Sequence, residues 1–484
     1  MKKKILFVTS EVYPLIKTGG LADVSGSLPQ ALKALGHEVK ILVPGYPKVL
    51  ASADFSPLPT RPETAPRLLR ALLPETEVDV WALQDESHFG REGNPYLGPD
   101  GHPWPDNAER FAHFCRVGTE IALDRLGLDF KPDIVHCNDW QSGLIPALLA
   151  DEPKRPGTVF TIHNLAYQGI FPRSTFEALK LPQRFWSPEA LEFYEQMSFI
   201  KGGLVFADRI STVSPTYARE IQAKEDGCGL EGLLTHRQSR LSGILNGIDT
   251  EAWNPATDPL LENHFNVKSL KARKVLKAQL QEISGLPLKP DLPVFAWVGR
   301  LVEQKGIDFL LESLPKLMAL PLQIVLIGTG DARYEKALSE WQHLFPERIS
   351  VFLGYSEARA HLAEAGTDVF LMPSRFEPCG LNQMYSQRYG AIPLVRRAGG
   401  LADTVTDATA KAIEEGTATG IVFETPSSDA FFEAIERALA LYAQKTVWSG
   451  IQKNGMRKDF SWETSALQYL DLYDAALGDR PKTP

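Results

Sequence analysis

The chain has 484 residues, of which 44% are hydrophobic and 23% are charged, and its formal net charge is −9 at pH 7. A domain usually spans about 100–200 residues, so we expect two or three globular domains, and the apolar content excludes a disordered chain. The acidic charge argues against a general nucleic-acid-binding or anionic-membrane-binding surface. The four cysteines form no Cys-x-x-Cys pair, which excludes a disulfide scaffold.

The first apolar run, Ile5–Val8, is too short for a signal peptide, and polar Thr9–Glu11 end it. No run approaches 18 apolar residues, so we expect no membrane span and a cytoplasmic protein.

Twelve short apolar runs recur along the chain, and they are typical of strands buried on both faces of a parallel sheet. Helical patterns lie between these runs. Two examples are Ser27–Leu35, which Gly36 ends, and Asn107–Leu126, which Gly127 ends. This alternation predicts a doubly wound α/β architecture. In chain order the runs are Lys4–Thr9, Glu38–Val43, Val78–Leu83, Asp133–Cys137, Thr158–Ile162, Arg209–Val213, Val294–Val298, Gln323–Ile327, Ser350–Leu353, Asp368–Met372, Ile392–Val395 and Gly420–Phe423.

Twelve strands are too many for one ordinary domain, and the turn- and proline-rich region Leu241–Leu292 predicts the break, with a helical pattern over Lys268–Gln281 inside it. We therefore predict two Rossmann-like domains with a cleft between them, over residues 1–244 and 245–456. Trp462–Leu477 predicts a helix, and the segment near 457–484 is a candidate to pack back on the first domain.

Polar, basic and glycine residues follow many of the predicted strands. Ligands of open α/β sheets bind beyond the carboxyl ends of the strands. Glycine lets a backbone approach a ligand closely, and helix N-termini with Lys or Arg favour phosphate, so this set predicts a diphosphate site. It comprises Lys17, Gly19, Gly20, Asp23, Asp139, His163, Arg300, Lys305, Gly328, Glu377, Gly399 and Gly400.

Taken singly, each of these residues has a plainer interpretation. A glycine pair is usually a turn, Arg300 or Lys305 a solvated charge, Glu377 a helix-start carboxylate and His163 a buried core histidine. All of these residues, however, lie at the same end of the inferred sheets, beyond the carboxyl ends of the strands, and this favours a functional site. The chain contains no Asp-x-Asp and no Gly-x-x-x-x-Gly-Lys-Ser/Thr motif, so we expect cations and helix ends, with no metal and no cofactor, to meet the phosphate charge.

At these residues the chain resembles the bacterial glycogen synthases and plant starch synthases over nearly its whole length. The resemblance implies a GT-B glycosyltransferase that moves glucose from ADP-glucose to the non-reducing 4-OH of an α-1,4-glucan and retains the anomeric configuration. It makes the first domain the acceptor side and the second the nucleotide-sugar side, with no nucleic-acid or membrane partner. The motifs that carry it are Lys17–Val24, His136–Trp140, Thr161–Gly169, Asn246–Asp249, Val298–Leu301, Gln304–Gly306, Glu377–Gln383, Arg388–Gly390 and Thr419–Gly420.

The resemblance also implies residue roles. Arg300 and Lys305 would hold the distal phosphate, Glu377 the glucose hydroxyls, and His163 would lie near the glucose 6-OH. Asp139 would lie near the donor glucose or the acceptor, and these five form the expected catalytic set. The expected substrate-binding set is Lys17, Gly19, Gly20, Asp23, Asn246, Gly328, Tyr355 (against the adenine), Cys379, Gly380, Leu381, Gly399 and Gly400.

Three positions depart from the family pattern: Ala398 before the second glycine pair, Ser356 after Tyr355, and Ile421-Val422 in the Thr-Gly-x-x-Phe segment. None of them removes a charged residue of the expected site. The alternatives are a related transferase that uses UDP-glucose or another acceptor, a pyridoxal-phosphate glucan phosphorylase, for whose lysine no motif is present, and a catalytically silent glucan-binding protein.

Overall fold

The computed structural model describes residues 2–62 and 64–479. The chain divides into two compact units: one comprises the chain up to Gly247 and again from Trp462, and the other is Ile248–Ser461. The last five residues of the predicted 457–484 segment lie outside the described residues. No helix among the described residues is long and apolar enough to cross a membrane.

The first unit is built on a nine-stranded sheet, in the order β12-β11-β7-β6-β1-β2-β5-β4-β3. The strands from β12 to β5 pair in parallel, and β4 and β3 add an antiparallel edge. Their bounds are β1 Lys4–Val8, β2 Glu38–Pro44, β3 Ser56–Leu58, β4 Leu68–Leu72, β5 Asp79–Leu83, β6 Ile134–Asn138, β7 Gly157–Ile162, β11 Arg209–Thr212 and β12 Leu241–Gly243.

Helices cover both faces of this sheet. On one face, Tyr473 of α19 (Trp462–Asp479) and His136 of β6 are joined by a hydrogen bond of 2.8 Å, and α1 (Gly20–Ala34) packs beside α19. On the other face lie α4 (Asn107–Ala122), α5 (Leu144–Leu149) and α7 (Phe199–Phe206), and a Cβ added at Gly118 of α4 would touch Leu42 of β2. The parallel strands are therefore buried from both sides, which explains their almost wholly apolar sequences.

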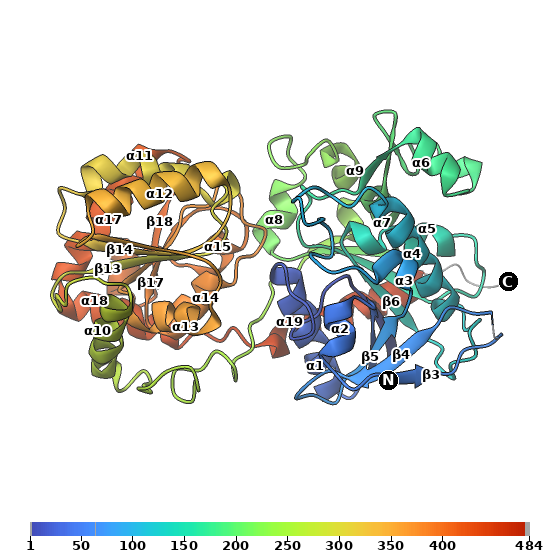
Figure 1. Ribbon diagram of the computed structural model, residues 1–484, viewed down its shortest axis with the longest axis horizontal. Helices are drawn as coiled ribbons and strands as arrows, with labels where there is room; N and C mark the ends of the chain where they lie inside the picture. The colour runs from blue at the N-terminus through green and yellow to red at the C-terminus, as the bar shows by residue number, and fades with distance from the viewer. Residues whose placement is uncertain (1, 63, 480–484) are drawn as a thin grey trace. The chain divides into compact units, whose positions relative to one another are not determined.

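The second unit holds a six-stranded parallel sheet, in the order β15-β14-β13-β16-β17-β18. One face packs on α11 (Ile307–Leu317), α12 (Ala332–Leu344) and α17 (Ser428–Ala443), and the other on α10 (Arg273–Ile283) and α13 (Glu357–Gly366) (Figure 1). The strands are β13 Val294–Val298, β14 Gln323–Gly328, β15 Ile349–Leu353, β16 Val369–Met372, β17 Ile392–Arg396 and β18 Ile421–Phe423.

The strand order reverses once in the parallel part of each sheet. The chain first adds β2 and β5 on one side of β1 and later β6 and β7 on the other, and it likewise adds β14 and β15 before β16 and β17 around β13. At such a reversal the loops leave in opposite directions and open a crevice beyond the carboxyl ends. The loops after β1 and β6, and those after β13 and β16, are thus the places for a ligand.

Each of the twelve predicted runs is a strand in the structure, within two residues of its expected ends. The helix expected at Ser27–Leu35 begins at Gly20 instead, because Gly26 does not break it: a Cβ there would lie 2.7 Å from the Tyr13 carbonyl oxygen, so glycine allows close packing. The helix expected to run to Leu126 ends at Ala122, before Asp124 adopts a φ of 58°.

The helix expected at Lys268–Gln281 begins at Arg273, after a 3-10 turn over Leu270–Ala272. The prediction missed β3, β4 and β12, and also a small antiparallel sheet of β8 (Ile170–Pro172), β9 (Glu192–Phe193) and β10 (Gln196–Ser198). These strands have two to five residues, and most are partly exposed, so no long apolar run marks them. The exception is β4, in which four of the five residues are apolar (LLRAL) and which the prediction passed over.

Candidate active site

The loop after β1 is held by a buried carboxylate that the sequence prediction did not single out. Glu11 is 3% exposed and accepts hydrogen bonds from the backbone N–H groups of Thr18 and, at 3.2 Å, Gly19. The Thr18 and Tyr96 hydroxyls donate to its other oxygen. Glu11 therefore fixes the glycine loop that leads into α1.

Lys17 and Asp23 form an ion pair at the start of α1. Lys17 Nζ lies 2.8 Å from Asp23 Oδ1, and both side chains are partly exposed. The ammonium group also lies 5.5 Å from the centre of the Tyr13 ring. Asp23 thus orients the cation that the sequence analysis predicts for the phosphate site.

Asp139 and His163 meet where β6 and β7 end. Asp139 is buried, has a left-handed φ of 54°, and accepts the backbone N–H of His163 at 2.7 Å. Burial raises the pKa of Asp139 to about 7, although the N–H groups of His163 and Asn164 oppose that rise. A strained, buried carboxyl group with a pKa near neutrality is typical of a functional position.

The His163 ring lies against Asn138 of β6, with Nε2 2.9 Å from Asn138 Oδ1. Burial lowers the pKa of His163 to about 3, so the imidazole is neutral at pH 7. With Nε2 as the donor to the amide oxygen, the neutral ring presents an acceptor at Nδ1.

In the second unit, Lys305 and Glu377 form a close ion pair. Lys305 ends the 3-10 turn Glu303–Lys305 (η5) after β13, and its Nζ lies 2.6 Å from Glu377 Oε2. Glu377 follows β16, is 5% exposed, and also accepts the Ser374 hydroxyl at 2.9 Å. The strand reversal at β13 thus brings together a cation and an anion separated by 72 residues.

The glycines of the second unit permit close backbone approaches. A Cβ at Gly399 would lie 2.0 Å from the Glu377 carbonyl oxygen, and one at Gly400 would lie 2.2 Å from that of Cys379. Likewise, a Cβ at Gly328 would lie 1.8 Å from the carbonyl oxygen of Gly299. The second glycine pair therefore backs the Glu377–Cys379 segment, and its contact with substrate stays a prediction.

The remaining predicted residues differ in exposure. Arg300 follows β13 on the surface, and the Tyr355 side chain is 73% exposed after β15. Asn246 is buried, and its side-chain oxygen finds no hydrogen-bond partner within the described part of the chain. Cys379 is buried, and Gly380, with a φ of 72°, and Leu381 precede α14 (Asn382–Arg388).

Sequence reasoning missed Glu11 and Tyr96 as parts of the site, and it gave no role to Asn138, although the motif His136–Trp140 contains it. Glu11 and Asn138 each stand at the carboxyl end of a predicted strand, so the rule that located Lys17 and Asp139 applied to them as well. Tyr96 carried no such signal, because it lies in a long loop of the N-terminal half.

A family model described as "Starch synthase catalytic domain" matches residues 4–236, and one described as "Glycosyl transferases group 1" matches residues 279–452. "Glycogen synthase 1" of Methylococcus capsulatus is 59% identical over 477 residues, which cover 98% of this chain and 97% of that protein. "Glycogen synthase" of Cellvibrio japonicus is 52% identical over 474 residues, which cover 97% of this chain and 98% of that protein.

Among solved structures, the catalytic domain of starch synthase IV from Arabidopsis thaliana, bound to ADP and acarbose, superposes with a TM-score of 0.89 at 31% identity. The match covers 99% of this chain and 100% of that one. Sucrose-phosphate synthase from Thermosynechococcus elongatus shares the fold, with a TM-score of 0.61 at 18% identity. The predicted fold class, two Rossmann-like α/β domains of the GT-B kind, is confirmed.

Proposed function

The chain belongs to the family of bacterial glycogen synthases and plant starch synthases, and from that premise we propose that it uses ADP-glucose as donor, transferring glucose to the non-reducing 4-OH of an α-1,4-glucan. We also propose that the anomeric configuration is retained. Glycogen synthase relatives at 50–59% identity over nearly the full length support glucosyl transfer. The ADP in the Arabidopsis thaliana enzyme supports an adenine nucleotide.

The single observation that carries the proposal is the Lys305–Glu377 ion pair at the strand reversal of the second unit. In the proposed reaction the bond between glucose and phosphate breaks, which leaves negative charge on the diphosphate and positive charge on the ring. Lys305, positioned by Glu377, and Arg300 would stabilise the diphosphate, and Glu377 would hold the sugar hydroxyls beside it. Fixed charges aimed at developing charge need no reorganisation as the bond breaks.

The first unit would supply uncharged and weakly acidic groups. His163 is neutral at pH 7, so it would accept or donate a hydrogen bond near the glucose 6-OH without adding positive charge. Asp139 would lie near the donor glucose or the acceptor. Since Glu11 already accepts the Thr18 and Gly19 amides, a phosphate at this loop would be bound by Lys17 or by the first N–H groups of α1.

The proton balance requires no protein base. The acceptor 4-OH would attack the anomeric carbon on the face that the diphosphate leaves, and an oxygen of the leaving phosphate would take the hydroxyl proton. The products are an elongated glucan and ADP, and attack on the same face retains the configuration.

The test is turnover with ADP-glucose and UDP-glucose side by side on glycogen, measured as release of ADP or UDP. We expect a much higher kcat/KM for ADP-glucose, and activity that persists with a chelator because cations of the chain meet the phosphate charge. Equal values for the two donors would overturn the donor assignment. No turnover with either would favour the silent glucan-binding alternative.

A further inference from the structure

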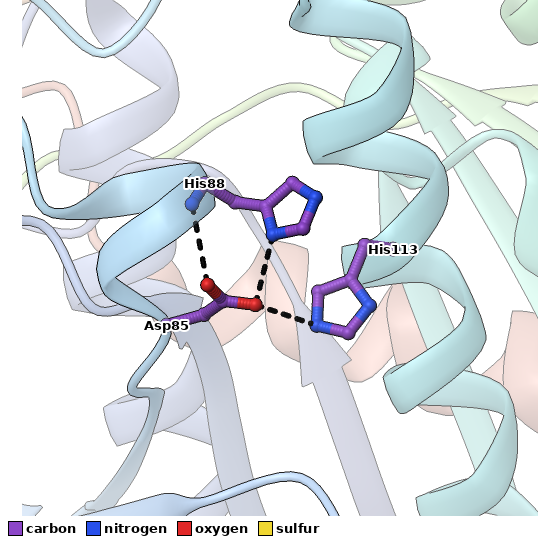
Figure 2. A group of neighbouring side chains, drawn as sticks. All are labelled: Asp85, His88 and His113. Atoms are coloured by element: carbon purple, nitrogen blue, oxygen red, sulfur yellow. Dashed lines mark hydrogen bonds and ion pairs between the residues drawn. The ribbon is translucent and has the colours of Figure 1, made fainter.

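Three metal-ligating side chains gather in the first unit, apart from the site described above. Asp85 follows β5, His88 lies on the short helix α3 (Glu86–Phe89), and His113 lies on α4. Their ligand atoms all lie within 4.8 Å of one another (Figure 2). Since β2 separates β5 from β1, strand spacing places the group roughly 10 Å along the sheet from the β1 loop.

Both imidazoles face the same carboxylate oxygen. Asp85 Oδ2 lies 2.8 Å from His88 Nδ1 and 3.2 Å from His113 Nε2. Figure 2 shows the His88 ring above this oxygen and the His113 ring to its right. The planes of the two rings are 16° from parallel, and their centres are 4.8 Å apart. Ligand atoms about 2.0–2.2 Å from a tetrahedral zinc ion are roughly 3.3 Å apart. To admit the ion, the rings would move slightly away from Oδ2, and the two ring nitrogens, which lie within 4.8 Å of one another, would move closer together.

The carboxylate is already oriented for this role. Its other oxygen, Oδ1, accepts the backbone N–H of Ser87 at 2.9 Å, that of His88 at 3.2 Å, and the Ser87 hydroxyl at 2.6 Å. Three donors on Oδ1 leave Oδ2 directed at the rings, as outer hydrogen bonds do for metal ligands. Burial raises the pKa of Asp85, but the hydrogen bonds from Ser87 and His88 outweigh this effect and lower the pKa to about 2, so the carboxyl group is ionised at neutral pH.

The histidine from α4 is suited to give a lone pair. Its Nε2 faces Asp85 Oδ2 at 3.2 Å, so a lone pair on that nitrogen would be directed at the ion. A metal ion would take the place of the hydrogen at the inner nitrogen of each ring, and the outer nitrogen of each ring would carry the N–H. The Ser87 hydroxyl, 3.0 Å from His88 Nδ1, would then give up that contact.

We propose that Asp85, His88 and His113 bind one divalent transition-metal ion, best matched by Zn²⁺, with a fourth position left to water. Two imidazoles and one carboxylate are a donor set that favours zinc over Mg²⁺ or Ca²⁺, which prefer oxygen. The ion would join α3 to α4 and stabilise the first unit. Sequence analysis expected no metal because the chain contains no Asp-x-Asp, and it did not connect these two histidines, which 24 residues separate.

The test uses the full chain after treatment with a chelator and dialysis. Co²⁺ serves as the spectroscopic probe, because four-coordinate Co²⁺ absorbs visible light, and Zn²⁺ titrations give affinity and stoichiometry. We expect one site per chain, Co²⁺ displaced by Zn²⁺, and a higher thermal midpoint with Zn²⁺ but not with Mg²⁺. H113Q and H88Q are each expected to weaken Zn²⁺ binding about 100-fold or more.

Two variants serve as matched controls. His102 is an exposed histidine of the same unit and Cys228 is an exposed thiol, so H102Q and C228S should bind Zn²⁺ like wild type. A cooperative thermal transition without metal shows that H113Q and H88Q are folded. The proposal is overturned if wild type gives no saturable Zn²⁺ binding, if binding survives in both histidine variants, or if C228S abolishes it.

Discussion

At the residue scale, Lys305 and Glu377 neutralise one another in the absence of substrate, so each sets how strongly the other acts. With Lys305→Ala we expect kcat to fall roughly 10²–10³-fold, with a smaller change in KM, because the charge on the phosphate grows as the bond breaks. ADP affinity should fall with it. The measurements are steady-state kinetics and ADP titration.

Glu377→Gln should separate the two roles. It keeps the shape of the side chain but removes the charge that offsets Lys305, 2.6 Å away. We expect a strong loss of kcat, because the sugar loses its partner, and ADP affinity that is unchanged or higher, because Lys305 keeps its full charge. ADP affinity as weak as in Lys305→Ala would place Glu377 in the nucleotide site.

Asp139 is a residue at which function opposes stability. Its pKa of about 7 in the folded chain exceeds the ordinary 3.8, so the folded state holds a proton that the unfolded state releases between these values, and its contribution to stability is lost as pH rises through 7. Asp139→Asn should therefore raise the thermal midpoint more at pH 8 than at pH 4.5, by roughly 2–4 °C per kcal/mol gained, while turnover falls.

The amide also suits this position in another respect. Asn can still accept the His163 N–H at its side-chain oxygen. Thermal scans at the two pH values, with circular dichroism as readout, measure the effect. Equal midpoint changes at pH 4.5 and pH 8 would contradict the assigned pKa.

At the element scale, strands buried on both faces were predictable and sheet edges were not. β13 and β14 read as continuous apolar runs because helices cover both of their faces. β3 has three mostly exposed residues, so no apolar run marks it. β4 is largely apolar but contains Arg70, and its antiparallel pairing with β5, like that of β3 with β4, is set by tertiary contacts. For the same reason Lys305 and Glu377 could be placed at one sheet edge, while the ion pair between them could not be foreseen.

The second glycine pair gives a prediction on packing between elements. Gly399, at a φ of 42°, starts α15 (Gly399–Thr404), and a Cβ there would meet the Glu377 backbone oxygen at 2.0 Å. Gly399→Ala should thus displace Glu377 and lower kcat. We expect it to cost about 1–2 kcal/mol for the backbone conformation and about 1–3 kcal/mol more for the overlap.

Gly416 supplies the matched control for this substitution. It also has a positive φ, 68°, but an added Cβ there meets nothing within 4 Å. Gly416→Ala should therefore show the conformational cost of about 1–2 kcal/mol without loss of turnover. Denaturant unfolding measures the stability of both variants, and steady-state kinetics measures their turnover. Equal losses of stability and of turnover in the two variants would refute the packing role of Gly399.

At the scale of the whole molecule, the first unit depends on a helix that follows the second unit in the chain. α19 buries Tyr469, Tyr473 and Ala476 completely, and Tyr473 is hydrogen-bonded to His136. A chain ended after Ser461 should lose several kcal/mol from the first unit, since one buried aromatic side chain alone is worth about 1.5–3 kcal/mol.

Calorimetry should resolve this loss. The transition of the first unit is expected to fall by on the order of 10 °C or to disappear, while that of Ile248–Ser461 stays in place. The single substitution Tyr473→Phe is a milder check, expected to cost about 1 kcal/mol for the lost hydrogen bond. A truncated chain with both transitions unchanged would show that α19 adds nothing to the first unit.

The late position of α19 also has a consequence for how the protein is made. On the ribosome, residues up to Gly247 emerge first, but the helix that covers β6 and β7 emerges only after Ile248–Ser461. At about 5–20 residues per second, the first unit waits roughly 10–40 s with an apolar sheet face uncovered. The second unit is contiguous and can finish folding in that interval. Nascent chains stalled near Ser461 should therefore recruit chaperones through the face that α19 later covers.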